Sequence, residues 1–381
     1  MINSYWPAHP QPKPDEIFSS WIHRVARANG KNFFSLCYCL APEMKNAHYN
    51  CDYVVTSEIV NKFCQVLRTP YSQAFNSTLD SYAGYLFEES TSKANRKSCI
   101  LQTGIKPNDY KRFNLQYCPI CLSCDEPYFR KKWRISLITV CTEHSCQLHD
   151  RCPECEAPVR PLRNEMHVNK KPSKKGMTKC YECDFDLKNA PIKSVDEQVL
   201  VDTRWYEEAL SFGYVCLDGE KWIYSFSFFS VLRHLIRCLT QKDSAQPDDG
   251  VIDTDVMTHE KRYNAVCRLS GLFSSWPTCF IKRYESMGLR YYELTAISRI
   301  SNPIPFWLET VLKEYFYSPN LSPSEQNIRA AIDYLINHGV DLNASVLNRF
   351  LGFSDSAVVN RVLKQYQKEK LFHLPYMRKT K

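Results

Sequence analysis

The cysteines of this chain are grouped in pairs that have the spacing of metal ligands. Four pairs with a two-residue gap fall between residues 118 and 183: Cys118/Cys121, Cys141/His144, Cys152/Cys155 and Cys180/Cys183. A two-residue gap lets both side chains of one tight turn reach the same ion, and two such turns complete a tetrahedral zinc site. Proline follows the first cysteine in two of the pairs, where it stiffens the turn. The pattern therefore predicts two zinc ions.

The spacing alone leaves the pairing of the turns open. We favour sequential sites, one made by Cys118, Cys121, Cys141 and His144 and the other by Cys152, Cys155, Cys180 and Cys183. A cross-braced arrangement would exchange the second and third pairs. Cys124, Cys146 and His149 lie close by and could replace a neighbour, although free groups beside a metal site are the simpler interpretation. Eight protein ligands fill two tetrahedral sites and leave no open position, which predicts structural rather than catalytic zinc.

The remaining composition indicates where such a protein works. No window approaches the roughly 18 consecutive apolar residues of a membrane span, and four prolines within residues 7–14 interrupt the apolar core of a signal peptide. We therefore expect a cytoplasmic protein. Cysteines stay reduced there, so the 18 cysteines favour metal over disulfides. Four pairs without a βαβ pattern also disfavour a redox motif.

The formal net charge of +8 is compatible with a polyanionic partner. Arg130-Lys-Lys-Trp-Arg134 interleaves basic and aromatic side chains, so Arg130, Lys132 and Arg134 are candidate contacts to a nucleic-acid backbone. A packed tryptophan with solvated basic neighbours explains the same segment equally well. The four lysines within residues 170–175 are better explained as a solvated loop.

The apolar periodicity predicts a mainly α, multidomain protein with four regions. These are an N-terminal helical domain (residues 1–110), a tandem zinc-knuckle or zinc-ribbon-like region (111–190), a helical domain (191–320) and a C-terminal module (321–381). The first helix is expected to start at an Asp15 cap, to bury Trp21 with its apolar neighbours, and to stop at Asn29-Gly30. Exposed segments are expected at residues 241–253 and 320–323.

The C-terminal module has the pattern of a helix-turn-helix. A helix over residues 324–337 precedes a second helix that Asn343 can cap, and Leu351-Gly352-Phe353 separates it from a third helix capped by Ser354 or Asp355. The third helix is expected to bury Val358 and Val362. Its exposed face would offer residue types that contact bases and phosphates, namely Ser356, Asn360, Arg361 and Lys364.

Two positions depart from that motif. Asn348 stands where a small Ala is usual, and Arg361 stands where an apolar residue is expected. The alternative interpretation is therefore a three-helix packing module that binds protein.

The sequence offers no pattern typical of an enzyme. There is no glycine-rich loop before a Lys-Ser/Thr pair, no nucleophile elbow and no zinc-protease helix motif. No His-x-Glu precedes a Cys-x-x-Cys, which argues against a deaminase or a zinc-stabilised nuclease. We expect a protein without catalytic residues.

Two segments resemble the TniQ/TnsD family. The first is a proline-rich lead, residues 12–16, into a helix that bears Glu16, Ser20-Trp21 and Arg24. The second begins at Tyr117-Cys118 and continues through Trp133, Cys141 and His144 to Cys152-Pro-Glu-Cys155, and it is similar to the family's zinc region. The resemblance covers residues 1–185, whereas the remaining half matches only in its general helical character.

The resemblance implies a bacterial target-site selector for DNA transposition, associated with the nucleoid when bound to its target. Family members of this kind link target DNA, or an RNA-guided Cascade complex in CRISPR-associated transposons, to a AAA+ ATPase of the TnsC type. They do no chemistry themselves, and the shorter ones pair as homodimers. The alternative is a stand-alone, sequence-specific, zinc-containing DNA-binding regulator that uses the C-terminal helices. A neighbouring transposase and ATPase gene would favour the first hypothesis, and an unrelated operon would favour the second.

Overall fold

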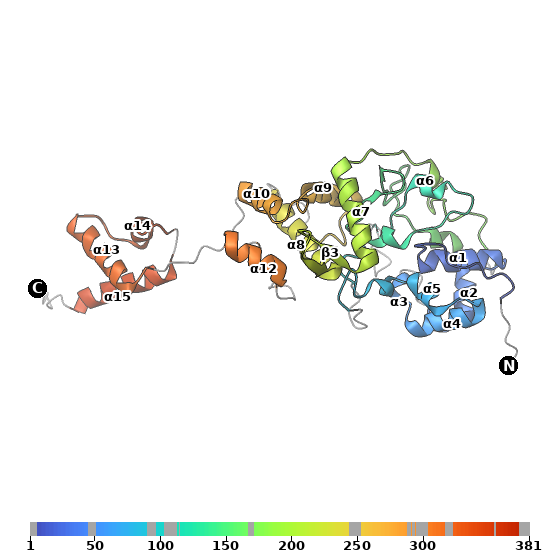
Figure 1. Ribbon diagram of the computed structural model, residues 1–381, viewed down its shortest axis with the longest axis horizontal. Helices are drawn as coiled ribbons and strands as arrows, with labels where there is room; N and C mark the ends of the chain where they lie inside the picture. The colour runs from blue at the N-terminus through green and yellow to red at the C-terminus, as the bar shows by residue number, and fades with distance from the viewer. Residues whose placement is uncertain are drawn as a thin grey trace, which may run out of the picture. The chain divides into compact units, whose positions relative to one another are not determined.

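The computed structural model describes residues 6–44, 51–89, 97–102, 113, 115–166, 171–243, 253–287, 291, 294, 304–316, 323–353 and 356–372. The chain divides into two compact units, Met1–Phe316 and Tyr317–Lys381, which are described separately (Figure 1). Helices predominate in both units, and the strands in the described residues form two short two-stranded sheets. The prediction of a mainly helical, multidomain protein is confirmed. No helix within the described ranges is long and apolar enough to cross a membrane.

Five short helices at the start of the first unit share one hydrophobic core. They are α1 (Phe18–Ala28), α2 (Phe33–Leu40), α3 (Cys51–Val54), α4 (Ser57–Leu67) and α5 (Tyr71–Asn76). The fully buried Trp21, Val25 and Phe63 lie in that core, as the apolar spacing of α1 predicts. Gly30, with a φ of 63°, ends α1 at the predicted place.

The predicted start of the first helix is wrong. The N-cap residue of α1 is Ile17, and no side chain caps the helix. Asp15 instead has a φ of 56° and its carbonyl accepts a hydrogen bond from the Lys131 backbone N–H at 2.6 Å. The chain before α1 therefore pairs with residues 129–131, which also form a bridge between Glu16 and Arg130. This pairing between distant segments overrides the local capping preference.

The cysteine-rich region consists of turns, 3-10 segments and one small hairpin. Its elements are α6 (Pro119–Leu122), the 3-10 helices Lys131–Arg134, Pro161–Glu165 and Leu187–Asn189, and the strands β1 (Val140–Cys141) and β2 (Cys146–Gln147). The strands pair antiparallel, with Cys141 opposite Cys146. Regular structure is scarce here because the turns that carry the paired cysteines take up most of the chain.

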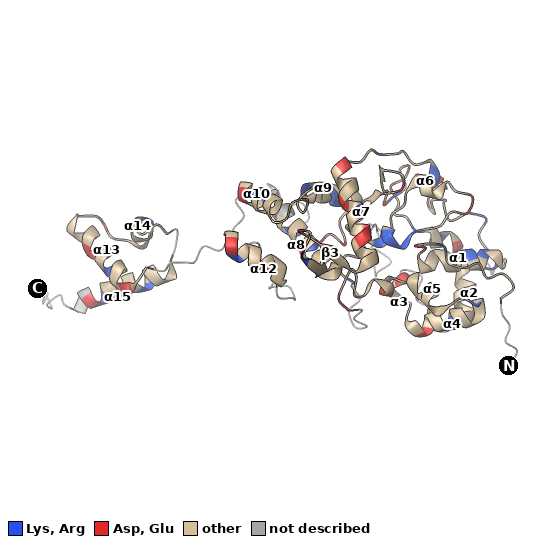
Figure 2. Ribbon diagram, in the orientation of Figure 1, with Lys and Arg blue, Asp and Glu red and all other residues tan. Residues whose placement is uncertain are grey.

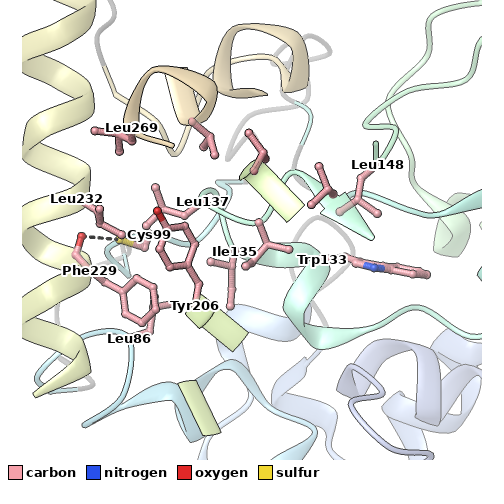
Figure 3. Close-up of a cluster of buried hydrophobic side chains, with 14 of the residues drawn as sticks. Leu86, Cys99, Trp133, Ile135, Leu137, Leu148, Tyr206, Phe229, Leu232 and Leu269 are labelled. Atoms are coloured by element: carbon pink, nitrogen blue, oxygen red, sulfur yellow. Dashed lines mark hydrogen bonds between the residues drawn. The ribbon is translucent and has the colours of Figure 1, made fainter. Parts of the chain in front are cut away.

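The helices that follow share their hydrophobic core with the cysteine-rich region. They are α7 (Glu197–Phe212), α8 (Ser225–Asp243), α9 (His259–Leu269), α10 (Thr278–Ser286) and α12 (Phe306–Val311), with a π-helical turn at Leu312–Phe316. The hairpin β3 (Tyr214–Cys216) and β4 (Trp222–Tyr224) connects α7 to α8. Figure 3 shows Trp133 and Ile135 of the cysteine-rich region in one buried cluster with Tyr206 and Phe229. Residues 244–252 of the predicted loop lie outside the described residues.

The second unit contains three helices around a core of its own. These are α13 (Glu325–Asn337), α14 (Ala344–Phe350) and α15 (Ala357–Phe372). Ser324 caps α13, and the Asn343 side chain accepts a hydrogen bond from the Val346 N–H at 2.9 Å, so the Asn343 cap is as predicted. Gly352, with a φ of 80°, lies in the turn between α14 and α15. The predicted caps Ser354 and Asp355, and residues 320–322 of the predicted linker, lie outside the described residues.

One detail of the third helix differs from the prediction. The fully buried residues of α15 are Val359, Val362 and Leu363, whereas Val358 is only partly buried. The buried stripe is therefore displaced by one residue at its start, because α15 packs on both α13 and α14.

Candidate metal centres

The first four predicted ligands meet at one point in the first unit. Cys118 and Cys121 lie at the start of α6, whereas Cys141 and His144 come from β1 and the turn after it. The Nδ1 atom of His144 lies 3.2 to 3.6 Å from the sulfurs of Cys118, Cys121 and Cys141. All four donor atoms lie within 4.8 Å of one another. The three cysteines of this group are buried, so their sulfurs are largely shielded from bulk water.

The second four predicted ligands form a separate group. The Cys152 and Cys183 sulfurs are 3.6 Å apart, and so are those of Cys155 and Cys180. Their four sulfurs also lie within 4.8 Å of one another. Cys152 and Cys180 are buried, whereas Cys183 is exposed. The structure therefore groups the donors in sequential order and not in a cross-braced order.

Three of the four turns have the same backbone geometry. The Cys152 N–H donates to the carbonyl of the fifth residue after it, Ala157, and the Cys152 carbonyl accepts from the N–H of the fourth, Glu156. Cys180 makes the same two hydrogen bonds with Phe185 and Asp184. That fourth residue has a positive φ, 58° at Glu156 and 62° at Asp184. The turn at Cys141 follows the same course, with Ser145 at 48° and Cys146 opposite Cys141. The fourth turn, at Cys118, is the short helix α6.

These distances fit a tetrahedral zinc ion. Zinc binds thiolate sulfur at about 2.3 Å, which places two sulfurs on one ion about 3.8 Å apart. The observed sulfur pairs, at 3.6 to 3.7 Å, have nearly this separation. Hydrogen bonding to the neighbouring sulfurs raises the pKa of the Cys121 thiol, with burial adding to the effect. A cation bound between the sulfurs would stabilise the thiolate form and so counteract this rise in pKa. The eight residues can therefore hold two metal ions.

The three nearby groups that could replace a ligand have different surroundings. Cys146 is buried, and its sulfur lies 3.6 Å from that of Cys118, so it contacts the first group directly. His149 is already engaged, because its Nε2 lies 2.8 Å from the Pro191 carbonyl and its ring stacks on Tyr117. Cys124 is exposed. Only Cys146 of these three is placed to serve as a fifth donor.

A motif at the start of α1, with Glu16 just before the helix and Ser20 and Arg24 on it, holds the N-terminal helices on the cysteine-rich region. Glu16 is buried and pairs with Arg24 at 2.6 Å. The Ser20 hydroxyl donates to Glu16 at 2.9 Å and accepts from the Phe129 N–H at 3.0 Å. Trp21 donates from its indole N–H to the Pro10 carbonyl at 2.8 Å. The motif therefore joins α1 to the backbone at Phe129, and none of these hydrogen bonds involves the metal-ligand groups.

The three basic residues proposed as nucleic-acid contacts in this region make internal ion pairs. Arg134 is buried and lies 3.1 Å from the Asp52 carboxylate. Arg130 pairs with Glu143 at 2.6 Å, and Lys132 pairs with Glu207 at 2.9 Å. Their side chains are at most 15% exposed, so all three are largely engaged within the first unit.

Asp52 is a residue that sequence reasoning missed. Its carboxylate also accepts from the backbone and the hydroxyl of Ser19, which lies on α1. A single acidic residue in a short helix gives no sequence signal of such a role.

The proposed nucleic-acid contacts of the second unit are partly engaged as well. The Asn360 amide oxygen accepts a hydrogen bond from Asn348 at 2.9 Å, and the Ser356 hydroxyl accepts one from the Val359 N–H at 3.4 Å. Arg361 and Lys364 are exposed on α15. Figure 2 shows that α15 carries both basic and acidic residues. Arg361 and Lys364 are thus the residues of this set that face solvent.

Comparison with known proteins gives one family. No curated protein matches the chain. Residues 7–148 match the model of the TniQ family. The matched segment contains the Glu16 motif of α1, the N-terminal helices and the whole of the first metal-ligand group, whereas the second group lies beyond it. Residues 7–148 of this chain are therefore similar to the TniQ family.

Proposed function

We propose that this protein selects the target site in DNA transposition, as an adaptor of the TniQ/TnsD kind without catalytic activity. The observation that carries the proposal is the TniQ match over residues 7–148, since TniQ domains are associated with target-site selection. In this proposal the regions 1–110 and 111–190 form the adaptor core. Region 191–320 supports that core, and the module at 321–381 contacts DNA.

The metal in both groups is zinc in this proposal, and its role is structural. One donor set has three cysteines and a histidine, and the other has four cysteines. Both sets are typical of structural zinc, which is bound by four protein ligands and therefore has no position for substrate. Zinc supplies folding free energy to turns that have little hydrophobic core of their own. Cys118, Cys121, Cys141 and His144 hold one ion, and the second group holds the other.

The partners in this proposal are those of the transposition machinery. One face of the adaptor meets target DNA or an RNA-guided Cascade complex, and another recruits a AAA+ ATPase of the TnsC type. The chain works as a homodimer when Cascade finds the target. It requires no catalytic residues, because a separate transposase breaks and joins the DNA strands.

The second candidate function, a stand-alone zinc-containing DNA-binding regulator, requires direct DNA contact through α15. Arg361 and Lys364 are exposed on one three-helix unit, and such side chains bind phosphates and guanine edges. Asn360 and Ser356 serve mainly to order the start of α15. In the adaptor proposal the same surface of α15 contacts the phosphate backbone of DNA without a sequence preference of its own.

The decisive experiment measures binding of the full chain to its native attachment region and to random duplex DNA over a series of salt concentrations. The slope of log affinity against log salt counts phosphate contacts, and the ratio of the two affinities measures sequence reading. A preference of about 10³ or more that Arg361→Ala removes would favour the regulator or a direct DNA-reading selector. Lys282→Ala, which removes an exposed lysine on α10, is the matched control.

A second measurement separates the adaptor from the regulator. The adaptor should co-purify with the ATPase encoded beside it, and deleting the gene should abolish targeted insertion while leaving transposase expression unchanged. Tight binding of the chain to its site, together with unchanged targeted insertion after deletion of the gene, would identify the regulator.

A further inference from the structure

The β3–β4 hairpin presents an aromatic surface that the metal sites and α15 do not explain. Tyr214 lies opposite Tyr224 and Cys216 lies opposite Trp222, so these four side chains share one face of the hairpin. The other face turns Val215, which is 1% exposed, into the core. Trp222, Tyr224 and Tyr214 are 69%, 55% and 48% exposed.

Neighbouring aromatic residues extend this surface. The rings of Tyr214 and Tyr224 lie 5.2 Å apart, and that of Phe226 stacks on Tyr224 at 5.3 Å. Phe212, at the end of α7, is 73% exposed and is separated from Tyr214 by Gly213. A Cβ atom at Gly213 would lie 3.3 Å from the Tyr85 ring, so Tyr85 also borders the hairpin. We call Tyr85, Phe212, Tyr214, Trp222, Tyr224 and Phe226 the aromatic face.

The residues around the aromatic face are mainly acidic, although the whole chain is basic. Residues 82–89 and 204–226 together carry six carboxylates and two basic side chains. Glu207 and Lys221 are engaged, in ion pairs with Lys132 and Asp218. Glu88, Glu89, Glu208 and Glu220 are exposed on the segments that bear the aromatic residues. An exposed aromatic surface with an acidic border is thus built into one side of α7 and the hairpin.

This combination selects one kind of occupant. Single-stranded nucleic acid stacks on aromatic side chains, but its phosphates need a basic border and would be repelled here. A symmetric contact with a second copy would bring two acidic borders together. A protein segment with arginine or lysine beside apolar residues satisfies both features, because its cations pair with the carboxylates and stack on the rings.

We propose that the aromatic face is the docking site for a basic, apolar segment of a partner protein. Trp and Tyr are the residue types that most often carry binding energy at interfaces, and they pair well with Arg. The inference deepens the adaptor proposal by naming the surface that meets one of its protein partners, and it rests on that proposal for its biological role.

The test uses the full zinc-loaded chain and a phage-displayed library of random 12-residue peptides. Peptides selected on the wild type should carry a net positive charge and at least one aromatic or proline residue. Their affinity should fall about tenfold or more for the double variant Trp222→Ser/Tyr224→Ser. Phe306→Ser removes a ring that is 82% exposed on α12, and it should leave binding unchanged.

Charge reversal tests the acidic border separately. Glu208→Lys and Glu220→Lys keep the aromatic residues and should weaken the selected peptides by about tenfold at low salt, with a smaller loss at high salt. Zinc content and circular dichroism must match the wild type in every variant, which shows that the fold is retained.

Several outcomes would overturn the inference. These are selected peptides that are neutral or acidic, equal losses for the double variant and for Phe306→Ser, and no selected peptide at all. Loss of binding to a 20-nucleotide single strand in the double variant would assign the surface to nucleic acid, and loss of self-association would assign it to a second copy. Failure of targeted insertion by the wild type would reject the adaptor function but leave peptide binding at this face intact.

Discussion

The side chain of Asn348 donates a hydrogen bond to the Asn360 amide oxygen at 2.9 Å and so joins α14 to α15. Asn348 also donates to the Ala344 carbonyl and accepts from the Ser356 N–H, each at 2.8 Å. Its own side chain is buried, with 2% exposed, whereas Asn360 and Ser356 are half-buried. The residue that departs from the usual small Ala of a helix-turn-helix is therefore one that links these two helices by hydrogen bonds.

We expect Asn348→Ala to loosen the second unit. The change removes the hydrogen bond to the half-buried Asn360 amide oxygen and the one from the Ser356 N–H, which costs about 1 to 3 kcal/mol. Amide exchange over residues 344–363 of the full chain should accelerate about tenfold or more, as followed by mass spectrometry. Asn337→Ala, at an exposed position of α13, should leave these rates unchanged. Equal rates in both variants would contradict the assigned role.

We expect Arg134→Met to destabilise the first unit while leaving DNA affinity unaltered. The ion pair with Asp52 is buried, and removing one partner of such a pair costs about 3 kcal/mol or more. Urea unfolding followed by tryptophan fluorescence should show the loss. Lys62→Met breaks an exposed pair with Glu43 and should shift the transition little. A normal transition combined with weaker DNA binding would return Arg134 to the nucleic-acid surface.

We expect metal analysis to find two zinc ions per chain, and Cys152→Ser to leave one. Because the Cys146 sulfur lies 3.6 Å from that of Cys118, His144→Ala should keep two ions by recruiting Cys146. The double variant His144→Ala/Cys146→Ala should keep one. Cys124→Ala changes an exposed thiol and should keep two. One ion in His144→Ala alone would show that Cys146 cannot replace the histidine.

We expect the stability of the first unit to fall as the pH drops from 6.5 towards 4, with His259 as one cause. Burial, together with the nearby positive charge of Arg262, lowers the pKa of His259 from its ordinary value near 6.5 to about 3. Below pH 6.5, His259 is therefore protonated in the unfolded chain but stays neutral in the folded chain. The contribution of His259 to the free energy of unfolding is complete above pH 6.5 and decreases as the pH falls, by at most about 5 kcal/mol.

Urea unfolding at several pH values measures this loss. His259→Gln should flatten the dependence between pH 6.5 and 4, because the group that titrates on unfolding is gone. His338→Gln alters an exposed histidine of the second unit and should keep the slope of the wild type. An unchanged slope in His259→Gln would assign the acid sensitivity to other groups.

The fold class and the donor groups could be anticipated from sequence because both leave strong local patterns. The apolar stripe around Trp21 and the two-residue gaps between cysteines are such patterns, and so is the Asn343 cap. The role of Asp15 could not be anticipated, because its carbonyl pairs with Lys131, more than a hundred residues away. The same holds for the Asp52–Arg134 pair, which joins two segments that have no common pattern.

The exposed aromatic residues illustrate a different limit. The spacing of Tyr214, Trp222 and Tyr224 equally fits a buried hairpin, and only the register shows that these side chains share the outer face. Likewise, a basic run such as Arg130-Lys-Lys-Trp-Arg134 has the same sequence whether its charges meet phosphates or carboxylates. Composition reports which groups are present, and three-dimensional pairing decides which of them remain available.

Glu165 gives the second metal site an influence beyond its own turns. It lies in the segment between Cys155 and Cys180, it is buried, and its carboxylate contacts His23 at 3.0 Å, Asn32 at 3.0 Å and Arg27 at 3.3 Å. An ion at the second site closes that segment into a loop and so holds Glu165 against α1 and α2. Metal affinity and the packing of α1 are thereby thermodynamically linked. If zinc at the second site raises the affinity of α1 for a partner, that partner must raise the affinity of the site for zinc by the same factor.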